Sequence, residues 1–112
     1  MSNFIDFGKE VKQRVGKFKQ NLPDISKHFW ALVQEGGKEG VLNKKTKVLI
    51  SLAIAIACRC DDCIVVHVQE YVAAQGTQKE LEEMIGVAVY MGGGPSMMYA
   101  THALQAFDEF SQ

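Results

Sequence analysis

The sequence predicts an all-α protein of five or six helices that form a single domain over residues 1–112. Apolar residues recur at spacings of three and four along several segments, which is the period of a helix with one buried face. Glycine and proline separate these segments, and residue types that cap helices stand at several of their starts. These observations together favour a small bundle of helices.

The first helix is expected over residues 1–20, and its pattern is amphipathic. The apolar stripe consists of Phe4, Phe7, Val11, Val15 and Phe18. Lysines fall away from this stripe, so we expect one face to pack and the other to meet water. The basic face has no interleaved aromatic side chains on which bases could stack, so we expect no nucleic-acid partner.

The second helix should begin at Pro23 and Asp24, because proline is well suited to the first turn of a helix. Trp30 lies within it and is expected in the core. Gly36 and Gly37 stand where a left-handed cap would end the helix.

The third helix should run from an Asn43 cap to about Ala57. Leu, Ile and Ala cover nearly its whole circumference, which predicts a buried helix. Its alanines argue against a strand, because alanine favours helix over strand. Three lysines near its start, at positions 44, 45 and 47, oppose the helix dipole, and the sequence offers no reason for that cost.

A fourth helix should begin around Asp61 or Asp62 and end at Gln75, before Gly76. Either aspartate could cap it.

The last two helices have the clearest boundaries. Thr77 and Glu80 form a capping-box pattern that predicts a fifth helix extending to about Met91. Three glycines then break the chain, and Pro95 suits the first turn of a final helix.

Length and composition exclude several classes of protein. A chain of 112 residues supports one modest core, and 47% hydrophobic with 22% charged residues is typical of a folded domain. The longest apolar stretch is too short to span a membrane, and the N-terminus lacks the apolar run of a signal peptide, so we expect a cytoplasmic protein without a membrane partner.

Net charge is −1, but the charges are unevenly distributed. Residues 1–47 hold ten basic and five acidic side chains, while residues 48–112 hold two basic and eight acidic ones. This polarity favours contact between the halves or between subunits.

The most specific pattern is Cys58, Cys60, Cys63 and His67, at the junction of two helices. Cys60 and Cys63 form a Cys-x-x-Cys pair, a spacing that allows two thiols at a helix start to meet. The helix dipole stabilises a thiolate there, and His67, one turn after Cys63, could accept its proton. A redox dithiol with a histidine base is the favoured interpretation, although Asp61 and Asp62 complicate it, because carboxylates raise a nearby thiol pKa.

Two other interpretations of the four residues remain open. Three thiolates and an imidazole are legitimate zinc ligands, but structural zinc sites usually draw ligand pairs from separated segments. Alternatively, the cysteines are small buried residues and His67 is a structural histidine. For Cys58 alone the buried role is preferred. His28 and His102 have no partner at ligand spacing and are expected to be structural.

Three stretches carry a resemblance to a known family. They are KTKVLISLAIAIACRCDDCIVVH at residues 45–67, AAQGTQKELEEM at 73–84 and YMGGGPSMMY at 90–99. The chain resembles the carboxymuconolactone decarboxylase superfamily, and its Cys-x-x-Cys-x-x-x-His core is similar to that of the alkylhydroperoxidase AhpD-like branch.

The resemblance implies an all-helical fold that assembles as homotrimers or homohexamers. It also implies peroxidase or disulfide-reductase activity with no cofactor and no metal, using Cys63 as the peroxidatic thiol, Cys60 as the resolving thiol and His67 in a proton relay. The implied partners are a small hydroperoxide or protein disulfide and a thiol reductant.

Two positions depart from the family pattern. The relay commonly includes a glutamate where this chain has Val48, and AhpD has a histidine where this chain has Asp62. Glu70 or Glu83 could supply a substitute carboxylate, although we expect each to be a surface acid.

We therefore expect an antioxidant oxidoreductase that uses Cys60, Cys63 and His67. The first alternative is a cofactorless decarboxylase-like lyase in which the thiols are incidental, and the second is a non-catalytic, metal-binding or scaffold oligomer.

Overall fold

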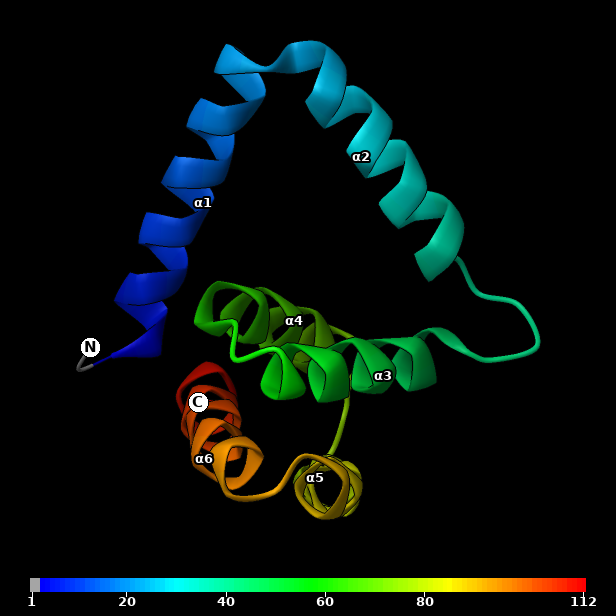
Figure 1. The fold of residues 1–112 in the computed structure, drawn as a ribbon, viewed down its shortest axis with the longest axis vertical. Coiled ribbons are helices and arrows are strands. Elements are labelled where there is room, and N and C mark those ends of the chain that lie inside the picture. Colours follow the sequence, from blue (N-terminus) through cyan, green and yellow to red (C-terminus); the bar gives the residue numbers. More distant parts are fainter. Residues whose placement is uncertain (1–2) are drawn as a thin grey trace.

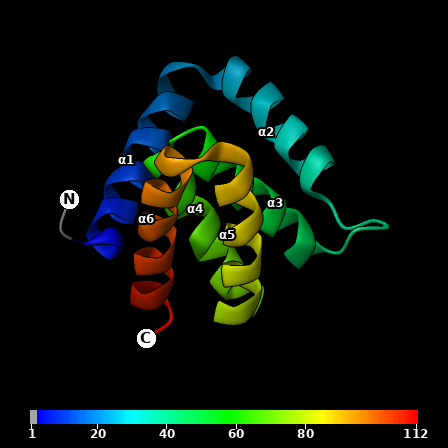
Figure 2. The ribbon, with the colours of Figure 1, turned by 60° about the horizontal axis from the view of Figure 1, so that its bottom comes forward.

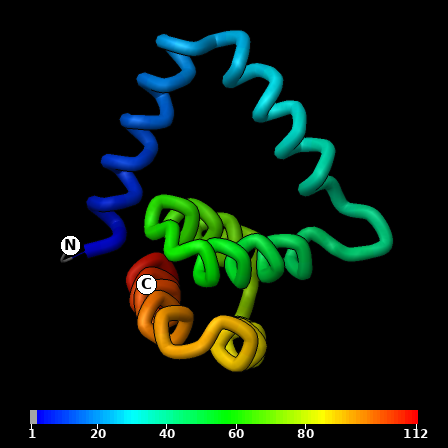
Figure 3. Tube along the Cα trace, viewed as in Figure 1, coloured from blue at the N-terminus to red at the C-terminus, as the bar shows by residue number. Residues whose placement is uncertain are grey.

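A computed structural model describes residues 3–112, which form six helices and no strand (Figure 1). The helices are α1 (Phe4–Asn21), α2 (Pro23–Gly37), α3 (Lys44–Ala57), α4 (Asp61–Ala73), α5 (Gln78–Gly92) and α6 (Gly94–Phe110). The all-α prediction is confirmed. The helices fall into two regions: α3–α6 form a bundle, and α1 and α2 form an arm that bends away from it (Figure 3).

The bundle contains the core. α3 packs against α4, α5 and α6, and α6 packs in turn against α4 and α5 (Figure 2). The largest fully buried side chains all come from α3, α4 and α5: Leu52, Ile56, Ile64, Val65, Val68, Tyr71 and Leu81. Burial of these side chains supplies most of the hydrophobic stabilisation, so the bundle is a firm base for any site built on it.

The arm is far less buried. Phe4, Gly8 and Val11 place the first half of α1 against the bundle. Among the described residues α2 contacts only α1 and α3, and Ser26 is its one buried residue. The prediction that Trp30 lies in the core is wrong: Trp30 is half-buried, stacked edge-on against Phe29 and beneath the ammonium of Lys19.

The lysines at the start of α3 now have a physical explanation. Lys47 Nζ donates to the carbonyl oxygens of Gly36 at 3.1 Å and Lys38 at 2.6 Å, and Lys44 Nζ donates to Gly37 at 3.4 Å. Ammonium groups at the carbonyl end of α2 are favourable for its dipole and satisfy carbonyls that have no partner within the helix. The predicted left-handed glycine cap is wrong, because α2 ends at Gly37 and Lys38 follows with φ −66°.

Most other helix starts match the prediction. The side chain of Asn43 caps α3, Thr77 and Glu80 form the full capping box of α5, and Pro95 lies in the first turn of α6. The predicted end of the fourth helix at Gln75 is wrong: α4 ends at Ala73.

The carbonyl end of α4 forms a Schellman motif. Gln75 has φ +62°, its N–H binds the Val72 carbonyl at 3.0 Å, and the Gly76 N–H binds the Tyr71 carbonyl at 2.9 Å. Gly76 is needed for a different reason, because a Cβ there would overlap the Tyr71 ring.

The prediction that α3 is buried all round holds for only part of its circumference. Ile50 and Ile54 are exposed, while Leu52 and Ile56 are fully buried. No helix among residues 3–112 is both long enough and apolar enough to cross a membrane.

Candidate active site

The segment that joins α3 to α4, residues 58–63, contains all three cysteines and includes the first three residues of α4; we call it the cysteine turn. α3 ends in a Schellman motif in which Arg59 has φ +56°, the Arg59 N–H binds the Ile56 carbonyl and the Cys60 N–H binds the Ala55 carbonyl. This reversal aims the start of α4 back across the end of α3.

Cys60 and Cys63 are joined by a disulfide, with their Cα atoms 5.2 Å apart. Cys60 is also the N-cap of α4, because its Sγ accepts a hydrogen bond from the Cys63 N–H at 3.1 Å. The expectation that Asp61 or Asp62 caps this helix is therefore wrong. With Cys60 at the cap, the positive end of the α4 dipole is directed at the sulfur pair, where it stabilises a thiolate.

Cys63 and His67 face the same space, as their spacing on α4 predicts. With Ser51, Ile54, Ala55, Cys58 and Cys60 they line a cavity of about 270 Å³, which we call the sulfur cavity. Its α3 wall carries no charged side chain, so among the lining residues His67 is the one imidazole that can act as a general base.

His67 is held by Glu70. The His67 Nδ1 and Glu70 Oε1 atoms lie 2.5 Å apart within α4, and both side chains are partly exposed. Because a carboxylate only accepts, the imidazole must donate from Nδ1, which leaves Nε2 as the basic nitrogen in the neutral ring. Glu70 is partly exposed, as expected of a surface acid, but it also contacts His67.

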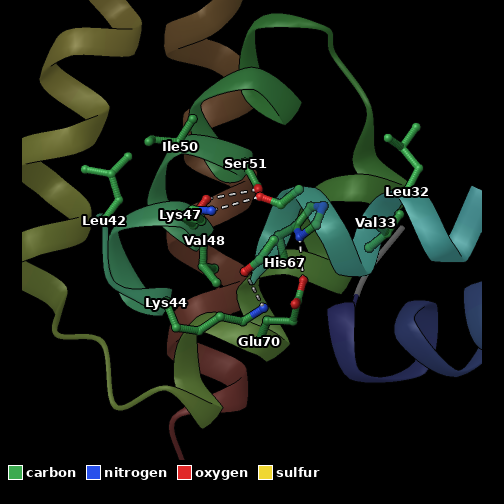
Figure 4. A pocket seen from close by; sticks show the side chains of 12 residues that line it. Leu32, Val33, Leu42, Lys44, Lys47, Val48, Ile50, Ser51, His67 and Glu70 are labelled. Atoms are coloured by element: carbon green, nitrogen blue, oxygen red, sulfur yellow. Dashed lines mark hydrogen bonds and ion pairs between the residues drawn. The ribbon is translucent and has the colours of Figure 1, made fainter. Parts of the chain in front are cut away.

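A second cavity of about 490 Å³ lies on the other side of His67, between α2 and α3, and we call it the arm cavity. Figure 4 shows His67 and Glu70 beside one another in this region, with Leu32 and Val33 contributed by α2. Ser51 and His67 line both cavities, so the histidine stands between them.

Val48 occupies the position where the family pattern has a relay glutamate. Its side chain is 3% exposed and lines the arm cavity together with Glu70. A carboxylate is therefore present beside His67, but it comes from α4 instead of α3. Glu83 is exposed on α5 and lines neither cavity.

The two aspartates between the cysteines bind other helices. Asp62 forms a two-point ion pair with Arg14 of α1, with N–O distances of 2.8 and 3.3 Å. Asp61 Oδ1 lies 2.6 Å from His102 Nδ1 of α6. Sequence reasoning missed both partners, because they are 48 and 41 residues away and no local pattern connects them.

Cys58 differs from its predicted role. It is an exposed free cysteine at the C-cap of α3, so the prediction that it continues a buried helix is wrong. Within residues 3–112 no group of three or more His, Cys, Asp or Glu side chains is arranged to hold a metal ion.

Comparison with proteins of known sequence finds relatives over most of the chain. An uncharacterized protein of Cupriavidus necator is 32% identical over 99 residues, covering 88% of each chain. An uncharacterized protein encoded in the cox locus of Paracoccus denitrificans is 35% identical over 95 residues, covering 85% of this chain and 86% of its own length.

Solved structures share the fold. A carboxymuconolactone decarboxylase family protein from Legionella pneumophila has 47% identity, covers 97% of both chains and superposes with a TM-score of 0.94. A family member from Thermotoga maritima, for which a part in the antioxidative response has been suggested, has 25% identity, covers 91% of this chain and 87% of its own, and superposes with a TM-score of 0.81. The model of the carboxymuconolactone decarboxylase family matches residues 23–106. The match contains α2, the cysteine turn and all of the bundle except the last residues of α6, and the chain belongs to the carboxymuconolactone decarboxylase family.

Proposed function

We propose that this protein is a thiol-dependent oxidoreductase of the AhpD-like type, which reduces a hydroperoxide or a protein disulfide. The observation that carries the proposal is the Cys60–Cys63 disulfide in one cavity with His67, whose other side is bound to Glu70. A dithiol, a base and a group that orients the base are the parts that such chemistry needs.

The peroxide reaction begins from the reduced dithiol. His67 Nε2 takes the Cys63 proton, and the thiolate attacks the terminal peroxide oxygen, so that an S–O bond forms and the O–O bond breaks. The alkoxide leaves as an alcohol with the proton from His67. Cys60 then gives up its thiol proton and attacks the sulfenic sulfur, so that the S–S bond forms, the S–O bond breaks, and the departing hydroxide takes that proton and leaves as water. An external thiol reductant supplies two electrons and two protons to restore both thiols.

Glu70 acts in this scheme as a positioning residue. Its carboxylate holds the Nδ1–H of His67, so it fixes the ring and keeps Nε2 basic. The same contact stabilises the imidazolium that forms when His67 takes the thiol proton. The family pattern has a relay glutamate at the position that Val48 occupies here. In this chain Glu70 takes the role of that glutamate.

A disulfide substrate would use the same groups. The Cys63 thiolate attacks one sulfur of the substrate, which breaks the substrate S–S bond, releases one substrate thiolate and leaves a mixed disulfide with the other. Cys60 then displaces the second substrate thiolate and forms the Cys60–Cys63 disulfide. Half-burial of Cys60 and Cys63 leaves the sulfurs within reach of a small molecule or an exposed loop. We place the reaction in the cytoplasm, where thiol reductants are abundant.

The family match also supports a second candidate, a lyase reaction without cofactor in which His67 is the acid or base. The two candidates differ at Cys60. A lyase does not need the thiol, so Cys60→Ser would leave its activity intact, whereas the same change abolishes a dithiol reaction.

The test is a thiol count on the reduced protein before and after one equivalent of hydrogen peroxide, with mass spectrometry to locate the new disulfide. We expect rapid loss of two thiols at Cys60 and Cys63. His67→Ala should slow it about 100-fold or more, the usual contribution of a catalytic base. Glu70→Gln should slow it about tenfold, equivalent to one hydrogen bond to a charged group.

Cys58→Ser is the matched control, because it removes the exposed cysteine beside the pair. We expect this variant to lose the same two thiols at the wild-type rate. If wild-type Cys60 and Cys63 stay reduced, or react slowly and independently, the dithiol mechanism is wrong and the lyase reaction becomes the leading candidate.

We also infer that the working form is a homo-oligomer, a homotrimer or homohexamer, in which a second copy covers the arm. Ile25, Phe29, Leu32 and Val33 on α2 are all exposed. The arm, residues 4–37, holds six basic and four acidic side chains, and the bundle, residues 44–110, holds five basic and eight acidic ones, so the arm of one copy complements the bundle of another in net charge.

Phe29→Asp should dissociate the assembly in sedimentation velocity. Gln34→Asp adds the same charge on the opposite side of α2, since helical residues advance about 100° each, and should leave the assembly intact. A wild-type protein that sediments as a monomer would overturn this inference.

A further inference from the structure

The first turn of α4 carries two negative charges next to the sulfurs. Asp61 and Asp62 lie between Cys60 and Cys63, and each contributes a carboxylate to the first turn of α4. Carboxylates in the first turn stabilise the helix, but the same charges oppose a thiolate only one or two residues away. Left unpaired, they would cancel much of the benefit that the α4 dipole gives to Cys63.

Each carboxylate is drawn to a different neighbouring helix. The Arg14 guanidinium donates hydrogen bonds to both carboxylate oxygens of Asp62. The hydrogen bonding and the negative charge of Asp62 raise the pKa of Arg14. Asp61 meets the Nδ1 atom of His102, a ring packed between Phe4 and Tyr99 at centroid distances of 6.0 and 5.0 Å. The cysteine turn is thus fixed to α1 on one side and to α6 on the other.

The other charged groups near the cysteines do not neutralise the negative charges of Asp61 and Asp62. Glu10 on α1 also acts on Arg14 and adds negative charge. His67 is already bound to Glu70, and the residues of α3 that line the sulfur cavity are uncharged. Arg59, in the turn itself, is exposed and has no ion-pair partner among residues 3–112, so water screens it.

We propose that Arg14 and His102 are positioning residues for the dithiol, which hold Asp62 and Asp61 against neighbouring helices and so relieve the repulsion between these carboxylates and the Cys63 thiolate. The inference rests on the proposed function for its biological meaning, but its physical content concerns the reactivity of Cys63 alone. One consequence is that the arm affects the chemistry, because Arg14 lies on α1.

The test is the rate at which iodoacetamide alkylates Cys63 in the fully reduced protein at neutral pH, with the site located by mass spectrometry. Arg14→Gln leaves Asp62 uncompensated, so alkylation should slow roughly three- to tenfold, which corresponds to half to one pKa unit. Asp62→Asn removes the repulsion and should speed alkylation by a similar factor. The double variant should return to within about twofold of wild type, because it has neither charge.

Opposite signs distinguish this role from a merely structural one. If the ion pair only braces the turn, both single variants loosen the same contact and shift the rate in the same direction. Arg14→Lys keeps the charge and should stay near wild type. The second pair gives an independent check: Asp61→Asn should speed the reaction and His102→Ala should slow it.

Circular dichroism of each variant confirms that it folds, and an exposed ion pair such as Arg14–Asp62 contributes little to stability. Alkylation needs no peroxide, so its outcome is separate from the proposed function. Suppose that Arg14→Gln slows alkylation and Asp62→Asn speeds it, but peroxide does not oxidise the dithiol. This result would support the present inference and contradict the proposed peroxidase activity. Rates for Arg14→Gln and Asp62→Asn that move together, or that stay within twofold of wild type, would overturn the inference.

Discussion

The helices of the arm are more strongly amphipathic than those of the bundle, but the bundle buries its apolar residues more completely than α2 does. In the bundle, Leu52, Val68 and Leu81 are fully buried. On α2 of the arm, Leu32 is 65% exposed and Phe29 is 53% exposed. A helical repeat of apolar residues therefore predicts that a face will pack, but not whether its partner is the same chain or another one.

Polar contacts supply much of the attachment between arm and bundle. Glu109 of α6 accepts a hydrogen bond from the Phe4 N–H at 2.6 Å, Arg14 binds Asp62, and Lys47 holds the end of α2. Exposed contacts of this kind are individually weak, so we expect the arm to open more easily than the bundle. Trp30 is the chain's one tryptophan and lies on α2, so its fluorescence reports on the arm, whereas circular dichroism reports mainly on the whole set of helices.

The largest contrast should come from two leucine truncations. Leu52→Ala removes a fully buried side chain and should lower the free energy of unfolding by about 2–5 kcal/mol, whereas Leu32→Ala on the exposed face should change the stability of one chain by less than about 0.5 kcal/mol. Urea unfolding followed by circular dichroism measures both. Equal losses at the two positions would mean that the arm is as deeply packed as the bundle, and a loss for Leu32→Ala that grows with protein concentration would show that it lies in a subunit contact.

Lys47 offers a way to weaken the arm alone. Lys47→Met keeps the aliphatic stem but removes two hydrogen bonds to carbonyls at the end of α2, which we expect to cost about 1 kcal/mol locally. The Trp30 fluorescence transition should then move to lower urea, with little change in the main circular dichroism transition. If the two transitions shift together, the arm and the bundle unfold as one unit.

Acid should loosen the same attachment through Glu109. Hydrogen bonds from the Gln105 amide and from the Phe4 N–H lower the pKa of its carboxyl. A folded-state pKa below the unfolded value of about 4.3 stabilises the folded protein above that pH, and the contribution is lost as the pH falls through the folded value. Trp30 fluorescence should therefore show the arm loosening below about pH 4.3, and Glu109→Gln should flatten that dependence. A wild-type curve with no arm transition in acid would contradict the assignment.

The sequence predicted what depends on neighbours along the chain. The Asn43 cap, the Thr77 capping box and the Cys60–Cys63 proximity are each decided within three or four residues. The position of Trp30 could not be predicted, because burial depends on how far α2 stands from the bundle.

The contacts of Asp61 with His102 and of Asp62 with Arg14 could not be predicted from the sequence for the same reason, because they depend on where α6 and α1 pack. Glu70 is different: its three-residue spacing from His67 was visible in the sequence and is a usual distance for contact on a helix. That local signal was sufficient to prefer Glu70 over Glu83 as the partner of His67.

The smallest expected effect concerns the end of α4, far from the arm. Gln75 adopts φ +62°, a conformation that glycine accepts without the steric cost that its own Cβ imposes. Gln75→Gly removes this strain but adds freedom to the unfolded chain, so the net stabilisation should be no more than about 0.5 kcal/mol. It should appear as a small shift to higher urea in circular dichroism, while any arm transition seen by Trp30 stays in place. A destabilised variant would mean that Gln75 contributes contacts that outweigh its backbone strain.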